Sequence, residues 1–588
     1  MPPPRLPVGR IPGAARLPRL PSNRHALTQP PRRELVSPPL VRPQLPFLSP
    51  LTTNRPLPPL SIHLRQHFAR LISTERRDYY KRRFGRGLRI GLSFYAILVL
   101  FQVIKMGMYQ EEIEHNWPTP PEWTWKSRWC LRSAQALMHP EQIGKLMTNW
   151  PMVAGYLREL LERLEDANGA DGKGVVAQGD DHGGFLVEGV GRTGLDVSAK
   201  TEPWRRGYFQ ALMGAAKAAE SLEGWLTDRK QRISAPADYV VGPSNPRPKP
   251  MPAGQTKVPR EEDCEPASPS PEVFYLRILT TRGFDTRQKL DAALAYADWL
   301  DYKGLQATAR DMYTWAMDIA AAGCADASRV VDLKTGVLKK AAAVSAGSPP
   351  LPSENILRVS TALAVHHARH GNLPTALSIF TSVLQARRAL PTASPDSPLT
   401  LPALPSLTRP NDPIRRFFTS LKNMFSPVEY PPALPSGDAP PPRTPASVCD
   451  EAGLMTYIGE ILFASSSQEK GLAWTRDAVD MAETTMMELG EGVDARHRCA
   501  ECLRVGLENW KTMVGRLVAQ AERAERESRQ QAEKAWFGGA SRVKTLELER
   551  KRWEAEQMIL DDRVRRVWPL IEGESGLEGI APNSSLFV

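Results

Sequence analysis

The chain has 588 residues, including 54 prolines and six cysteines, and a formal net charge of +11. This length allows two or three domains, but many prolines lie in segments that cannot form helices or sheets. Six cysteines are too few for a disulfide scaffold in a chain this long. The charge does not indicate nucleic-acid binding, because residues 1–74 carry about +10, residues 75–110 about +6 and the remainder about −5.

The first segment, residues 1–73, is predicted to be a disordered mitochondrial transit peptide. It is rich in Pro and Arg and has no Lys. Ser61 to Ser73 is amphipathic and contains no acid, which is typical of such peptides. Arg70 to Ser73 resembles the cleavage pattern of the matrix peptidase. A plain disordered basic tail is the alternative.

Residues 90–108 are predicted to form a single transmembrane helix. Ile90 to Ile104 is uncharged, and Arg89 and Lys105 bound it where long side chains can reach the interface. Residues 74–89 form a basic flank and glutamates follow the span, so we expect the flank to stay on the matrix side. A buried core helix is the alternative interpretation.

Residues 109–230 are predicted to be a helical region interrupted by a loop over 168–201. That loop contains Gly189-Val-Gly191-Arg-Thr-Gly194, which has the spacing of a dinucleotide-binding fingerprint. The fingerprint requires a strand before it and a helix opening within it. Since no convincing helix pattern opens before Pro203, we interpret the segment as a loop.

The rest of the chain alternates between Pro-rich segments and helical repeats. Residues 231–271 and 389–447 are predicted to be Pro-rich linkers, and residues 272–388 and 448–520 to be tetratricopeptide-like repeats. Residues 521–588 are predicted to be a charged helical tail, with a solvated extension at its start. The expected fold class is all-α: a degenerate tetratricopeptide-repeat solenoid with one N-terminal transmembrane helix and long disordered linkers.

The repeat prediction depends on small residues at fixed offsets. In one copy Ala297, Ala309 and Ala316 occupy the positions where two antiparallel helices touch, and Gly304 falls at a further fixed offset. A second copy begins near Leu357 and a third near Ala452, each with a similar pattern. Generic amphipathic helical hairpins are the alternative.

Four short signatures accompany this order of features. They are N-W-P-T-P-P-E-W after the span, A-D-W-L-D-Y-K-G, Y-I-G-E-I-L-F-A-S followed by G-L-A-W-T-R-D-A-V, and C-A-E-C-L-R-V-G-L-E-N-W. Over about residues 75–520 the chain resembles the fungal adaptor family of the mitochondrial i-AAA protease. The resemblance implies an inner-membrane protein with repeats in the intermembrane space, which delivers unfolded membrane proteins to that protease.

Enzymatic motifs are not found. The sequence contains neither G-x-x-x-x-G-K-[ST] nor H-E-x-x-H, so we expect no enzyme, no cofactor and no metal. Cys499 and Cys502 lie at i and i+3 and are interpreted as core thiols, with a disulfide or metal site as the alternative. His366, His367 and His370 are interpreted as packing residues of the second repeat and not as ligands.

Five exposed polar positions are the candidates for peptide binding, because the repeat register places them on the first helix of each pair. They are Asp298, Asp301, Tyr302, Arg369 and Glu460. The expected partners are the i-AAA protease complex and unfolded polypeptides, with no nucleic acid. A non-enzymatic scaffold or assembly factor for another inner-membrane complex is the alternative function.

Overall fold

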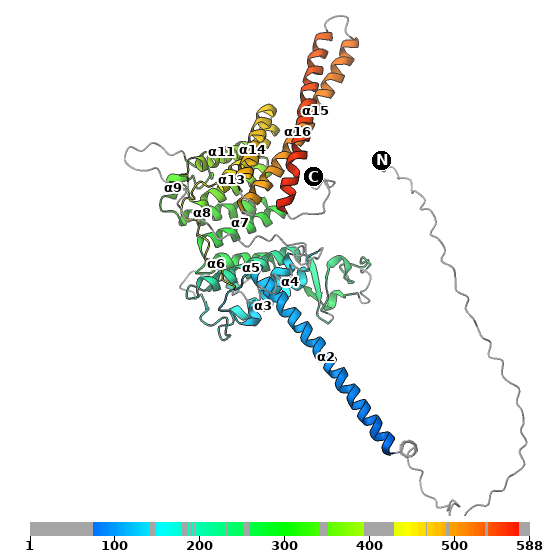
Figure 1. Ribbon diagram of the computed structural model, residues 1–588. Coiled ribbons are helices and arrows are strands. Elements are labelled where there is room, and N and C mark those ends of the chain that lie inside the picture. The colour runs from blue at the N-terminus through cyan, green and yellow to red at the C-terminus, as the bar shows by residue number, and fades with distance from the viewer. Residues whose placement is uncertain are drawn as a thin grey trace, which may run out of the picture. The chain divides into compact units, whose positions relative to one another are not determined.

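The structure is a computed structural model in which the fold is mostly helical (Figure 1). The predicted transit peptide and much of the linker 389–447 lie outside the described residues. The described residues are 74–139, 147–178, 186–187, 191–192, 194–230, 232–250, 258–339, 351–392, 428–465, 467–489, 494–534 and 539–575.

The helical part of the predicted fold class is confirmed. The described helices of four or more residues are α2 (Thr74–Asn116), α3 (Trp125–Met138), α4 (Trp150–Glu165), α5 (Glu202–Ser221), α6 (Pro271–Thr280), α7 (Thr286–Tyr302), α8 (Gln306–Ala322), α9 (Ala327–Val330), α10 (Glu354–Arg369), α11 (Leu373–Arg388), α13 (Pro445–Ala464), α14 (Gln468–Glu488), α15 (Asp494–Lys534) and α16 (Gly539–Ser575).

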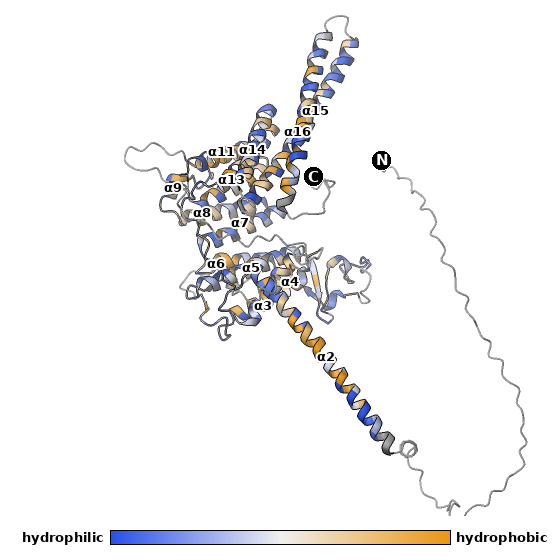
Figure 2. Cartoon of the chain, viewed as in Figure 1, coloured by the Kyte–Doolittle hydropathy of each residue, from blue (hydrophilic) through white to orange (hydrophobic). Residues whose placement is uncertain are grey.

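Helix α2 is long and apolar enough to cross a membrane. Its most apolar stretch has a mean hydropathy of 1.9, and none of that stretch is buried against the rest of the described chain. Figure 2 shows this apolar run, which follows a hydrophilic start of the same helix. The chain divides into two units, residues 1–95 and 96–588, and the remaining elements belong to the second.

The helices after α2 pack in pairs along the chain. The pairs are α3 with α4, α5 with α6, α7 with α8, α10 with α11, α13 with α14, and α15 with α16. The second helix of each pair also contacts the first helix of the next pair. Each pair therefore buries its apolar faces against its neighbours, as stacked helical repeats do.

The positions that the repeat pattern assigns to packing are buried. Gly304 and Gly371 close the turns of two pairs with φ of 76° and 79°, where glycine is favoured. In the pair α13/α14, Gly459 of α13 lies so close to α14 that a Cβ atom would be 2.9 Å from the Gly471 carbonyl oxygen. The buried packing residues include Tyr296, Ala297, Leu300, Ala309, Tyr313, Ala316, Leu363, Ala364, His367, Ala376, Phe380, Val383, Ile458 and Ala478.

Short strands lie in two segments that were predicted to be a loop and a linker. The described part of 231–271 supplies two strands to a three-stranded antiparallel sheet of order β6-β5-β7, so this segment is not wholly unstructured. The short 3₁₀ helices η4 (Ala237–Tyr239) and η5 (Glu261–Asp263) accompany it. The strands are β1 (Val176–Ala177), β2 (Leu186–Val187), β3 (Gly191–Arg192), β4 (Leu195–Asp196), β5 (Trp225–Asp228), β6 (Ser234–Pro236) and β7 (Cys264–Pro266).

The described end of the linker 389–447 is held in an extended conformation against two helices. Arg206 of α5 donates to the carbonyl oxygens of Pro431 (2.6 Å) and Pro432 (2.9 Å), and its guanidinium stacks on Tyr430. Asn355 of α10 donates to the Ser436 carbonyl oxygen over 2.9 Å. These bonds satisfy backbone groups that a Pro-rich segment cannot pair within itself.

The prediction that Ala519 to Lys534 is a solvated extension is wrong for one face of α15, where Ala521, Glu525 and Ser528 are buried. The second charged helix of the tail, α16, also buries one face. These two helices lie side by side (Figure 1). On α16, Trp553, Leu560 and Val567 are buried in a cluster that also contains Trp510 of α15. These three apolar residues of α16 recur at intervals of seven, which places them on one helical face.

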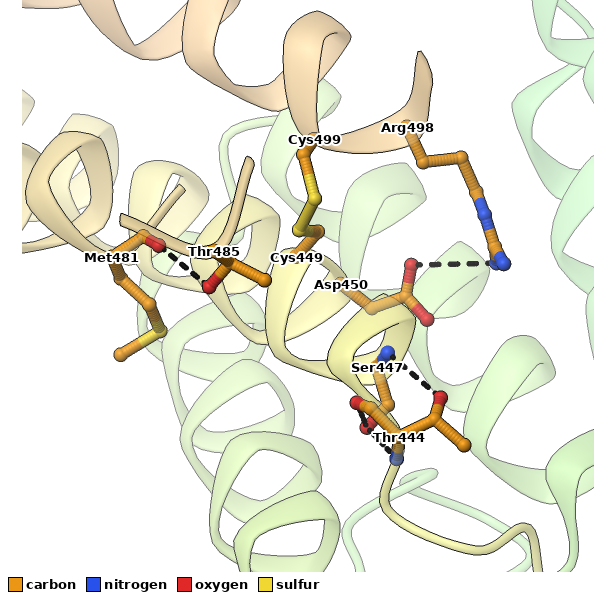
Figure 3. The surroundings of a disulfide bond; sticks show 8 residues. All are labelled: Thr444, Ser447, Cys449, Asp450, Met481, Thr485, Arg498 and Cys499. Atoms are coloured by element: carbon orange, nitrogen blue, oxygen red, sulfur yellow. Dashed lines mark hydrogen bonds and ion pairs between the residues drawn. A yellow bond between two sulfur atoms is a disulfide. The ribbon is translucent and has the colours of Figure 1, made fainter. Parts of the chain in front are cut away.

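A disulfide joins Cys449 at the start of α13 to Cys499 at the start of α15, with a Cα–Cα distance of 5.1 Å (Figure 3). Cys499 is a buried core residue, as predicted, and the alternative of a disulfide also holds for it, with Cys449 and not the neighbouring Cys502 as its partner. That residue remains a free thiol, and burial raises its pKa to about 11, so it stays protonated at neutral pH.

The close crossing of α13 and α14 predicts a large effect of one methyl group. In Gly471→Ala the new Cβ atom overlaps the backbone of Phe463 and Gly459. We expect a loss of roughly 1–3 kcal/mol of stability, measured as a lower Tm of the full-length protein in detergent. Gly515→Ala is the control, because nothing lies within 4 Å of that position on α15. Equal Tm values for the two variants would contradict this packing.

The disulfide predicts how many thiols react when the unfolded chain is alkylated and its mass is measured. Four should react before reduction and six after it. Cys449→Ala should destabilise the protein by up to about 4 kcal/mol, because the bond closes a long loop in the unfolded chain. Its Tm should no longer respond to dithiothreitol. Cys502→Ala is the matched control and should keep that response. Six thiols labelled without reductant would rule the bond out.

Candidate functional site

The structure brings together four of the five predicted peptide-binding residues, on α7 and α10. Asp298 and Tyr302 lie one turn apart on α7, and the Tyr302 side chain is exposed. Arg369 at the end of α10 places its Nη1 atom 3.6 Å from Oδ1 of Asp298. Asp298 and Arg369 are both exposed, so this ion pair adds little stability and either group remains able to meet a ligand.

Glu460 is exposed on α13, in the next pair of helices. Burial raises the pKa of the nearby Tyr457. Glu460 lies on a different helical pair from the other four residues and is not part of their cluster.

Asp301 is placed differently from the other four residues. The repeat register predicts that Asp301 faces solvent, but its side chain is only 4% exposed. His366 and His370 of α10 both lie within hydrogen-bond distance of its oxygens. A peptide bound on the exposed surface therefore meets Asp298, Tyr302 and Arg369 before it can reach Asp301.

An open cleft of about 880 Å³ adjoins this surface. Asp298 and Tyr302 form part of its wall on α7, and α3, α5 and α6 supply the remainder. Its lining combines five aromatic residues and two methionines with eight polar or charged residues. The lining residues are Trp117, Gln135, Met138, His139, Phe209, Gln210, Met213, Gly214, Lys217, Glu220, Ser221, Tyr275, Asp291, Ala295, Asp298, Trp299 and Tyr302.

The charged groups of the cleft are mainly acidic. The Tyr275 hydroxyl donates to Glu220 over 2.6 Å, and burial raises the pKa of Glu220. Asp291 is paired with Arg358 of α10 at 2.5 Å. Lys217 is the one basic residue of the lining, so the cleft favours ligands that combine apolar surface with positive charge.

The cleft lies close to the end of the apolar helix. Trp117 follows α2 directly and stacks on His139 of the cleft wall, with ring centroids 5.3 Å apart. The end of α2 is tied to α3, because Glu114 forms ion pairs with Arg128 (2.8 Å) and Arg132 (3.1 Å). Trp117 is nine residues beyond Met108, which corresponds to about 14 Å of helix.

The cleft was not predicted, because it combines residues of α7, in the first repeat, with residues from outside the recognised repeats. The available signal was the tryptophan-rich connector from Trp117 to Trp125 that follows the span. The glycine-rich fingerprint gives no evidence of a nucleotide site. β2 and β3 pair antiparallel as a hairpin, and the next described helix begins only at Glu202.

No family model, no curated protein and no solved structure matches this chain.

Proposed function

We propose that this chain is a membrane-anchored adaptor. It binds unfolded segments of mitochondrial inner-membrane proteins and delivers them to the i-AAA protease. The observation that carries the proposal is the cleft beside the end of α2, lined by aromatic rings and methionines. The family resemblance of the sequence supports the choice of protease.

The lining suits segments of variable sequence. Methionine side chains are flexible and polarisable, and they adapt to apolar partners of different shape. Met138 and Met213 contribute such side chains, while Phe209, Trp299 and Tyr302 offer rigid apolar area. The acidic groups complement the Lys and Arg residues that flank membrane spans on the side facing the matrix. The cleft therefore fits a span that has left the bilayer better than it fits one defined small molecule.

The proposed topology places α2 across the inner membrane, its basic start in the matrix and residues 109–588 in the intermembrane space. The distribution of charge around α2 supports this orientation. The Cys449–Cys499 disulfide supports it further, because structural disulfides are rare in reducing compartments. Both observations are independent of the cleft.

Anchoring explains how a weak binding surface can be effective. Client, adaptor and protease share one membrane, so the second encounter takes place at a high effective concentration. A cleft with modest affinity also releases its client to the protease. The helical pairs α7/α8, α10/α11 and α13/α14, which carry the proposed tetratricopeptide repeats, extend this surface beyond the cleft.

Binding of an unfolded apolar peptide is the experiment that tests the proposal. The full-length protein in nanodiscs is titrated with a fluorescent peptide of a membrane span flanked by lysines. Tyr302→Ala should weaken binding about 10-fold, equivalent to about 1.4 kcal/mol, because an exposed aromatic contact is lost without disturbing the core. Met558→Ala on α16 removes a comparably exposed apolar side chain away from the cleft and should bind as the parent does.

Two outcomes would contradict the proposal. If the parent protein does not bind the peptide or a heat-denatured model protein, it is a scaffold and not an adaptor. If both variants lose affinity equally, binding does not use the cleft. Co-purification of an AAA protease with the parent supports delivery, whereas a different stable partner favours assembly of another complex.

A further inference from the structure

A buried carboxylate lies between two helical pairs, outside the cleft lining. Asp301 of α7 is within 2.8 Å of Nδ1 of His366, and within 3.2 Å of Nε2 of His370. The two histidines are four residues apart, so both rings project from one face at the end of α10. Their ring centroids are 4.6 Å apart.

The charge of Asp301 requires compensation. An ionised carboxylate with a side chain only 4% exposed is costly to bury unless a cation accompanies it. Among the described residues its ion-pair partners are these two imidazoles and no Lys or Arg. The compensating charge comes from a protonated imidazole or from a bound cation, and the two ring nitrogens that face the carboxylate are also metal-ligand atoms.

We propose that Asp301, His366 and His370 bind a Zn²⁺ ion. Two imidazole nitrogens and a carboxylate oxygen are a ligand set that zinc takes in proteins, with metal–ligand distances near 2.0–2.2 Å. Ligand atoms at the corners of such a tetrahedron are about 3.3 Å apart. The three atoms of this cluster already lie within 4.8 Å of one another, so small side-chain movements suffice.

Zinc coordination would fix the tautomer of each histidine. Coordination through Nδ1 of His366 leaves its hydrogen on Nε2, and coordination through Nε2 of His370 leaves its hydrogen on Nδ1. Zinc takes both imidazoles in the neutral form and the carboxylate in the ionised form. Tyr313 lies in a second layer, where its hydroxyl donates to Asp298 over 2.9 Å and is 3.5 Å from Oδ2 of Asp301.

The ion links two successive pairs of helices. Asp301 belongs to α7, the first helix of the pair α7/α8, while His366 belongs to α10 and His370 directly follows it. Zinc therefore fixes the relative position of Tyr302 and Arg369, which flank the ligands in sequence. The site holds with or without the adaptor function, because it depends only on these three ligands.

Metal titration of the full-length protein in detergent tests the proposal. After treatment with a chelator, Co²⁺ is added as a spectroscopic probe and Zn²⁺ is then used to displace it. We expect one equivalent of Co²⁺ with the visible absorption of a tetrahedral site, loss of that absorption on adding Zn²⁺, and a higher Tm with Zn²⁺.

Two variants and one control make the test specific. Asp301→Asn keeps the shape of the side chain, and His370→Ala alters a partly exposed residue at the helix end, so at least one should fold. Each should bind Zn²⁺ about 100-fold more weakly than the parent. His497→Ala removes an exposed histidine of α15 and should bind normally. Failure of the parent to bind one equivalent, or unchanged affinity in a folded variant, would overturn the site.

Discussion

The apolar surface of α2 is the constraint on which the account depends. Its most apolar stretch is not buried against the described chain, and an exposed apolar surface of this size is typical of a segment that a bilayer or another protein covers. The ion pairs of Glu114 with Arg128 and Arg132 connect this helix to the helical pairs, because they fix the end of α2 to α3. Trp117, which lines the cleft, follows directly after this helix.

Stacking of helical pairs determines where the candidate sites form. The second helix of each pair contacts the first helix of the next, and α7 also contacts α10. Residues distant in sequence thereby become neighbours: Asp298 meets Arg369, and Asp301 meets His366. The intervening segments need not be helical for this to work. The extended end of the linker 389–447, near Tyr430, and the small sheet around β5 lie beside the helical pairs without interrupting their order. The disulfide between α13 and α15 joins the last two pairs covalently.

Local periodicity was sufficient to predict helices, and long-range pairing was not predictable. The small residues around Ala297 and Gly459 indicated close helix crossings, because small side chains at this spacing let two helices approach each other. Nothing local pairs Cys449 with Cys499, since 50 residues separate them and Cys502 is nearer. Asp301 was assigned to an exposed face for the same reason, because its histidine partners lie on another helix. The seven-residue interval of Trp553, Leu560 and Val567 was an available signal that the high charge of the tail obscured.

Photo-crosslinking inside the cleft tests the central claim most directly. A photoreactive amino acid at Met213, in the cleft wall, is compared with one at Met558, on the exposed face of α16, in the full-length protein in its native membrane. The account predicts that position 213 crosslinks to apolar segments of other membrane proteins and that position 558 does not. Identical products from the two positions, or no membrane-protein segments at position 213, would contradict it.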